Sequence, residues 1–144
     1  MKRWWVLAVL LLLAGCREVR VQTLAGGTTT QSQGGNQLLI VRDPNGLARL
    51  GIRAPVRFKN EFIVLLLMGP HDRTGYRQII ESIRANAQRV RIVAFEQAPA
   101  DGGEPAADYR TYTLWIIPNS VYRSGVHVDA VTPSDDPIAQ TVLP

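Results

Sequence analysis

The chain has 144 residues, of which 46% are hydrophobic, and a formal net charge of +4. Lys2 and Arg3 lie in an N-terminal segment that we expect to be removed, and the remaining 14 basic and 12 acidic residues leave a net charge of +2. This balance, with no aromatic residues interleaved in a basic stripe, excludes a nucleic-acid-binding protein. The length supports one small domain that needs no disulfide bonds to fold.

The first fifteen residues have the layout of a secretory signal. A basic head is followed by an apolar run over residues 4–13 and by the small residues Ala14 and Gly15. A membrane-spanning helix needs about 20 apolar residues, so this run is too short to remain as an anchor. The pattern predicts a signal peptide over residues 1–15.

Cys16 is the only cysteine of the chain. Leu13-Ala14-Gly15-Cys16 resembles the lipobox of bacterial lipoprotein precursors. The resemblance implies cleavage between Gly15 and Cys16, diacylglycerol on the sulfur and an acylated N-terminus, and two or three acyl chains anchor a protein firmly. The alternatives are a plain secretory signal beside a chance cysteine, or an uncleaved anchor.

The lipid on Cys16 would place the protein in the cell envelope. It would lie either on the outer membrane or on the extracytoplasmic face of the cytoplasmic membrane. Arg17 follows the cysteine. The resemblance to Gram-negative lipoproteins associates inner-membrane retention with aspartate there, so arginine favours the outer membrane.

Two polar segments flank the expected domain. Residues 22–37 are rich in Gly, Thr, Gln, Ser and Asn, which predicts a flexible linker. The whole lipid-anchored linker, residues 16–37, would span roughly 25 Å. Residues 129–144 contain three prolines and few large apolar side chains, which predicts a disordered tail. The folded domain is then expected over residues 38–128.

The domain opens with a short apolar strand, "QLLIVRD", and Asp43 and Pro44 then predict a helix that Gly51 ends. A continuous apolar run over residues 61–69 predicts a strand buried on both faces. Residues 76–84 and 89–97 predict a hairpin, followed by a loop over 98–108 and a strand over 109–118. The fold class expected is mainly β, a small antiparallel sandwich or barrel-like domain with one short helix near its start.

Catalytic and metal-binding patterns are weak. His71 and Asp72 resemble part of a dyad, but neighbouring side chains diverge, so we expect a solvated turn there. His127 and Asp129 would share one face of a strand, yet a catalytic zinc site needs three protein ligands and a structural one four. The chain has no phosphate-binding loop and no Gly-x-Ser-x-Gly elbow. We expect no catalysis, no metal and no cofactor.

Two further groups have alternative interpretations. Arg89 and Arg91 could recognise a carboxylate or phosphate, or form the solvent-facing side of a strand. Tyr109, Tyr112 and Trp115 could form a ligand-binding shelf, or serve as core and cross-strand partners.

The stretch "EFIVLLLMGPHDRTGYRQIIESI" resembles the C-terminal domain of PrcB-like proteins. That family has an apolar strand, a glycine, a polar loop ending in Thr-Gly-Gly-Tyr, a strand, a proline-rich loop and a final tyrosine-bearing strand closed by proline. The matching positions over residues 40–118 are Gly69, Thr74, Gly75, Tyr76, Pro99, Gly102, Tyr112 and Pro118.

Three positions depart from the family pattern. Only Gly75 precedes Tyr76 where two glycines are usual, Gln78 stands at an apolar position, and Thr111 replaces a proline. The Gly-Tyr pair still has a physical reason, because glycine permits a positive φ at a tight strand entry while the aromatic ring covers the turn.

The resemblance implies a non-catalytic, membrane-tethered subunit that binds or stabilises an exported protein, such as a subtilisin-like protease. The candidate binding loop is His71, Asp72, Arg73, Thr74, Gly75 and Tyr76. For Thr74, Gly75 and Tyr76 the alternative is a purely structural turn and aromatic plug. The loop also resembles the Thr-Thr-Gly-Tyr loop of chagasin-like protease inhibitors. An inhibitor, or a cell-wall or ligand-binding β domain, therefore stands as an alternative.

Overall fold

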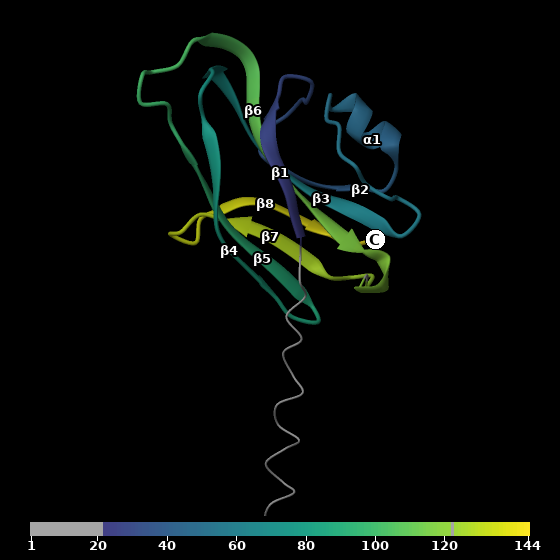
Figure 1. Cartoon of the computed structure of the whole chain (residues 1–144). Helices are drawn as coiled ribbons and strands as arrows, with labels where there is room; N and C mark the ends of the chain where they lie inside the picture. Colours follow the sequence, from purple (N-terminus) through teal and green to yellow (C-terminus); the bar gives the residue numbers. More distant parts are fainter. Residues whose placement is uncertain (1–21, 122) are drawn as a thin grey trace, which may run out of the picture.

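The computed structural model describes residues 22–121 and 123–144 (Figure 1). These residues form a β sandwich of two four-stranded sheets, in the orders β1-β6-β3-β2 and β4-β5-β7-β8. The elements are β1 (Gln22–Thr29), β2 (Gln37–Val41), α1 (Pro44–Arg49), β3 (Glu61–Arg73), β4 (Arg77–Ala85), β5 (Arg89–Gln97), β6 (Pro105–Pro118), η1 (Asn119–Val121), β7 (His127–Val131) and β8 (Pro137–Val142).

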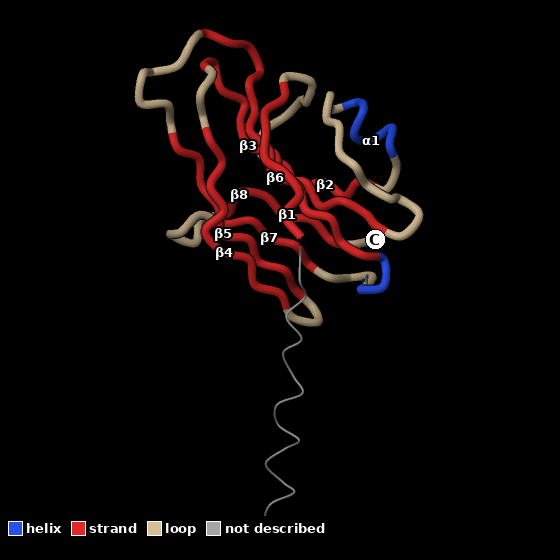
Figure 2. The backbone as a smooth tube through the Cα atoms, viewed as in Figure 1, coloured by secondary structure: helices blue, strands red, loops and turns tan. Residues whose placement is uncertain are grey.

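Strands dominate the backbone, and one short α-helix lies early in the chain (Figure 2). The mainly β fold class is therefore confirmed, with two separate sheets in place of a closed barrel. The predicted signal peptide, its cleavage site and Cys16 lie outside the described residues. Within the part of the chain that is described, no helix is long and apolar enough to cross a membrane.

Strand β3 is buried on both faces, as its unbroken apolar run predicts. It lies between β2 and β6, and its alternate side chains enter two different cores. Phe62, Val64 and Leu66 face the core between the sheets. Ile63 and Leu65 face a second core on the outer side of the first sheet. A strand with apolar residues at every position suits this place because it has no solvent-facing side.

The second core is covered by α1 and by the extended residues 52–58. Asp43 is the N-cap of α1 and accepts a hydrogen bond at 2.9 Å from the Gly46 N–H, as the sequence predicts. The helix has six residues and buries only Leu47, so packing and not helix propensity holds it in place.

The predicted hairpin is present as β4 and β5, joined by residues 86–88. Ile92 and Ala94 of β5 are buried, and Arg89 and Arg91, which precede them, lie on the opposite face of the strand, as the alternation predicts. Strand β5 pairs on its other side with β7 in parallel, while every other pair among the described strands is antiparallel.

The predicted linker over residues 22–37 is wrong for its first half. Gln22–Thr29 forms β1 and pairs with β6 along its length, from Gln22 opposite Ile116 to Thr29 opposite Arg110. Backbone pairing with β6 at the edge of the sheet holds this strand in place. Thr29 also donates a hydrogen bond at 2.6 Å to the Leu50 carbonyl oxygen. Only residues 30–36 form a loop.

The predicted disordered tail is also wrong, and the domain does not end at residue 128. Residues 129–144 complete β7 and contain β8, and Ala130 and Leu143 are buried in the core between the sheets. The prolines are compatible with this because Pro137 is the first residue of an edge strand, a position that needs no backbone N–H in the ladder.

Candidate binding site

The predicted binding loop is mostly strand. Strand β3 continues to Arg73, and its last part pairs with β6, with His71 opposite Tyr109 and Arg73 opposite Pro105. Only residues 74–76 connect β3 to β4. The predicted loop over 98–108 is correspondingly shorter, because β6 begins at Pro105. We call residues 71–76 and 98–104 together the tip of the domain.

The two segments of the tip hold each other. The Thr74 N–H donates to the Glu104 carbonyl oxygen at 2.8 Å, and the Glu104 N–H donates back to the Thr74 hydroxyl oxygen at 3.1 Å. The Arg73 guanidinium donates to the Gly102 carbonyl oxygen at 3.2 Å. These contacts order both connections before any partner arrives, which lowers the entropic cost of binding.

Glycine is required where the two segments meet. Gly75 has a φ of 89°, and a Cβ there would lie 2.7 Å from the Pro99 Cβ. Gly103 has a φ of 65°, and a Cβ there would lie 2.1 Å from the Thr74 carbonyl oxygen. The expected positive φ at Gly75 is confirmed, and Gly103 is a second position that only glycine fits.

The side chain of His71 turns into the domain. Its ring stacks on Tyr76 with centroids 3.7 Å apart, and its Nε2 lies 2.7 Å from Glu96 Oε2. The His71 and Glu96 side chains are only 18% and 12% exposed. The expectation of a solvated turn at His71 and Asp72 is therefore wrong for His71, while Asp72 is exposed. The Tyr76 ring packs on the His71 ring beside the turn.

A polar layer continues from Glu96 across the sandwich. Thr111 donates its hydroxyl to Glu96 Oε1 at 2.5 Å and accepts a hydrogen bond at 3.3 Å from Gln78 Nε2. Gln78 Nε2 also lies 3.4 Å from the Leu66 carbonyl oxygen. His71 and Thr111 belong to the first sheet, and Gln78 and Glu96 to the second. The layer therefore joins the two sheets directly beneath the tip.

The order of this layer does not match a nucleophile–histidine–carboxylate triad. Glu96 lies between His71 and Thr111, so no hydroxyl is hydrogen-bonded to the imidazole. Thr111 is 1% exposed, which keeps its hydroxyl away from any substrate. The geometry suits a fixed support for the tip.

The sequence analysis did not identify Glu96 as a site residue. It named Thr111 and Gln78 but predicted no hydrogen bond for either of them. Glu96 has the same parity as the buried Ile92 and Ala94, so an inward-facing carboxylate could have been found. His71 gave no such signal. A bulge between Met68 and His71 shifts the parity of β3, and alternation read from the apolar run fails beyond it.

The outer surface of the tip region is acidic. Within the tip, the exposed carboxylates are Asp72, Asp101 and Glu104, and the exposed cation is Arg73. The surface is therefore suited to a basic or polar partner and not to an anionic one.

Arg110 fixes the neighbouring loop of residues 30–36. It is 2% exposed, and its guanidinium donates to the carbonyl oxygens of Ser32 at 3.1 Å and Gly35 at 3.5 Å. No carboxylate among the described residues lies within ion-pair distance of it. A buried cation must then be satisfied by these backbone acceptors, which ties the loop to β6.

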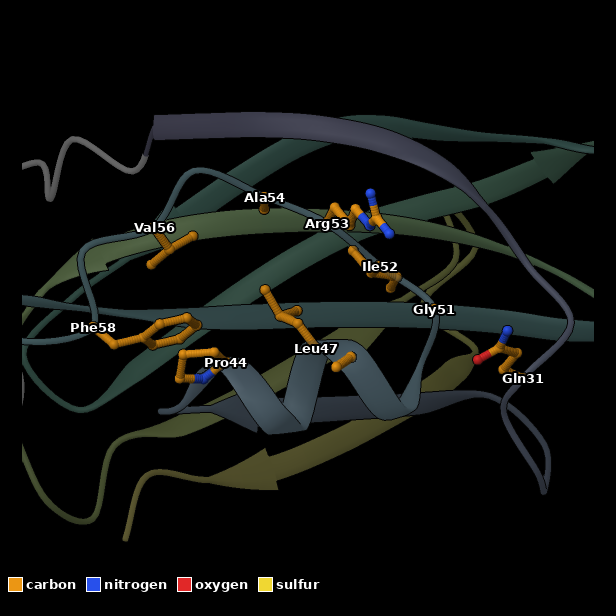
Figure 3. A pocket seen from close by; sticks show the side chains of 10 residues that line it. Gln31, Pro44, Leu47, Gly51, Ile52, Arg53, Ala54, Val56 and Phe58 are labelled. Carbon is orange, nitrogen blue, oxygen red and sulfur yellow. The ribbon is translucent and has the colours of Figure 1, made fainter.

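A groove lies between α1 and residues 52–58, beside the outer face of the first sheet (Figure 3). Its volume is about 560 Å³. The lining is mainly apolar, from Leu47 of α1 to Val56 and Phe58, while Gln31 and Arg53 supply polar groups. Its volume falls within the range of small-ligand sites. No pattern in the sequence indicated this groove.

Arg89 and Arg91, the candidate anion-binding residues, both form ion pairs within the domain. Arg89 Nε lies 3.0 Å from Asp129 Oδ2, and Arg91 forms an ion pair with Asp135, so neither arginine presents an unpaired guanidinium. Asp129 is engaged by Arg89, and the described residues hold no group of three possible metal ligands.

The three aromatic residues of β6 do not form one shelf. Trp115 lies in the core between the sheets, whereas Tyr112 packs against the second core on the opposite face. Tyr109 lies nearer the tip, opposite His71.

Comparison of the chain with family models, curated proteins and solved structures found no significant match.

Proposed function

We propose that this chain is a non-catalytic lipoprotein of the bacterial cell envelope that binds or stabilises an exported protein through its tip. The lipid would be carried by Cys16, and the partner class suggested by the PrcB-like pattern is a subtilisin-like protease. The tip and the anchored end of the chain would then face a partner and a membrane, respectively.

One observation carries the proposal: the tip lies at the end of the domain away from the start of β1. Gln22 pairs with Ile116 on β6, whereas the tip adjoins Pro105 at the other end of the same strand. Eleven residues at about 3.3 Å each separate the two ends by up to about 36 Å. In Figure 1 the loop after β5 and the start of β1 are at opposite sides. This arrangement supports the proposal, because an acidic surface would then face away from the anchor.

Site-specific photo-cross-linking in intact cells tests this proposal. A photoreactive amino acid replaces the exposed Asp101 at the tip, and the control places it at the exposed Asn45 of α1. We expect an adduct with an exported protein at position 101 and none at position 45. Equal adducts at both positions, or none at 101, would count against the tip as the binding surface.

The nature of the partner is tested separately. If the chain stabilises an envelope protease, its deletion lowers the abundance of that protease, and restoring the wild-type chain recovers it. A chagasin-like inhibitor would instead block turnover when the purified domain is added to a papain-type enzyme. A stabiliser leaves that turnover unchanged.

The groove beside α1 supports a ligand-binding domain as the second candidate. A ligand bound there would be released when the groove is filled by Ala48→Trp, since Ala48 lines it and is exposed. Native mass spectrometry of the purified protein would detect a bound small molecule in the wild type and its loss in the variant. The tip would be unaffected.

A further inference from the structure

The tether between lipid and domain is short if Cys16 carries the lipid, an assumption that this inference takes from the proposed function. Strand β1 begins at Gln22, six residues after Cys16. Six residues span at most about 20 Å even when fully extended. The side of the domain at which β1 starts must therefore remain near the lipid headgroups.

We call that side the base. It is formed by the ends of the two sheets that lie away from the tip. It includes the turn of residues 57–60 before β3, the β4–β5 turn, and η1 with the residues that follow it. Figure 1 places the β4–β5 turn, η1 and the start of β1 on the side away from the loop after β5.

The base is basic. Its exposed cations are Arg42, Arg57, Lys59, Arg84, Arg89 and Arg123, and its carboxylates are Asp43, Glu61 and Asp129. Six basic and three acidic side chains leave a net side-chain charge of +3. Lys59, Arg84 and Arg123 form no ion pair with any described residue. Charge is thus separated along the domain, with the basic end at the base and the acidic end at the tip.

We infer that the base binds the anionic headgroups of the membrane that carries the anchor. A cation close to an anionic leaflet contributes about 1 kcal/mol, but only within about a Debye length of the surface. A short tether strengthens this contact, because it keeps the base within reach of the headgroups. Binding at the base holds the domain upright, with the acidic tip pointing away from the membrane.

Vesicle co-sedimentation tests the inference with residues 16–144 carrying Cys16→Ser. This chain retains every described strand and both cores and has no lipid, so its result is independent of whether Cys16 is modified. The vesicles contain phosphatidylcholine alone or an equimolar mixture with phosphatidylglycerol, at about 0.1 M ionic strength. We expect binding to the mixed vesicles only, and its loss at about 1 M. Failure to bind the mixed vesicles, or equal binding to both kinds, would overturn the inference.

A matched pair of variants locates the surface. Lys59→Gln/Arg84→Gln/Arg123→Gln removes three charges from the base. Arg49→Gln/Arg53→Gln/Arg77→Gln removes three exposed charges elsewhere and is the control. The partition coefficient onto mixed vesicles should fall on the order of 100-fold for the first variant. For the control variant it should change by less than about 5-fold. Equal losses would show a general charge effect and refute a binding surface at the base.

Discussion

The imidazole ring of His71 lies parallel to the phenol ring of Tyr76, with 3.7 Å between centroids and 6° between planes. The same imidazole contacts Glu96 of the second sheet. His71 therefore connects the β3–β4 turn to the polar layer beneath it, and the shape of the tip depends on a short series of contacts that can be removed one at a time.

Removing the aromatic ring should loosen the tip. Tyr76→Ala eliminates the stack on His71, and we expect a loss of about 1–3 kcal/mol in the free energy of unfolding. Tyr76→Phe keeps the ring and should cost less than about 0.5 kcal/mol. Urea denaturation of both variants measures the difference. Equal stability of Tyr76→Ala and the wild type would show that the stack contributes nothing.

Glu96 and Thr111 should be energetically coupled. Glu96→Ala leaves the Thr111 hydroxyl without its acceptor, so adding Thr111→Val to Glu96→Ala should cost less than Thr111→Val alone. A double-mutant cycle should give a coupling of at least about 0.5 kcal/mol. Pairing Thr111→Val with Glu81→Ala on the exposed side of β4 is the control and should be additive. An additive result for Glu96 would contradict the hydrogen-bonded layer.

Alanine substitutions at two neighbouring glycines distinguish the cost of a steric clash from the cost of backbone strain. Gly102 and Gly103 both have a positive φ, but a Cβ at Gly102 meets nothing within 4 Å, whereas at Gly103 it would collide with the Thr74 carbonyl. Gly102→Ala should cost only the conformational term of about 1–2 kcal/mol. Gly103→Ala should cost clearly more and should weaken cross-linking from the tip. Thermal melts of the two variants provide the comparison, and equal shifts would argue against the close approach of the two segments.

Arg110 should control the order of the loop at residues 30–36. Arg110→Met keeps most of the buried aliphatic volume but leaves the Ser32 and Gly35 carbonyls without their donor. We expect faster amide hydrogen exchange across this loop and a loss of about 1–3 kcal/mol in stability. Protection in the β4–β5 hairpin should fall only as much as global stability does. Unchanged exchange in the loop would show that Arg110 does not order it.

Apolar periodicity predicted the interior of this fold well. The unbroken run of β3, the alternation in β5 and the Asp43-Pro44 helix start each correspond to one local physical rule. The predictions failed where stability comes from non-local backbone pairing. Strand β1 holds Gly26 and Gly27 with several threonines, and it exists because β6 offers an edge. Strand β8 similarly depends on its pairing with β7. Strand β7 in turn pairs with β5, where Arg89 lies opposite His127, 38 residues later in the chain.

The candidate site was predicted only in part. Gly75 and Tyr76 were identified through the resemblance to PrcB-like proteins, and the positive φ expected at Gly75 is present. The contact of His71 with Glu96 joins two sheets across a bulge, and no sequence period reports such a contact. The groove beside α1 is formed by a helix and an extended segment packed on a sheet, so it exists only in the assembled domain.

The central claim, a lipid-anchored binding domain, is tested most directly by mass spectrometry of the N-terminal peptide of the protein isolated from membranes. The account predicts a peptide that begins at Cys16 and carries diacylglycerol on sulfur with an acylated amino group. A peptide with an unmodified Cys16 thiol, or one that retains the preceding residues, would contradict it.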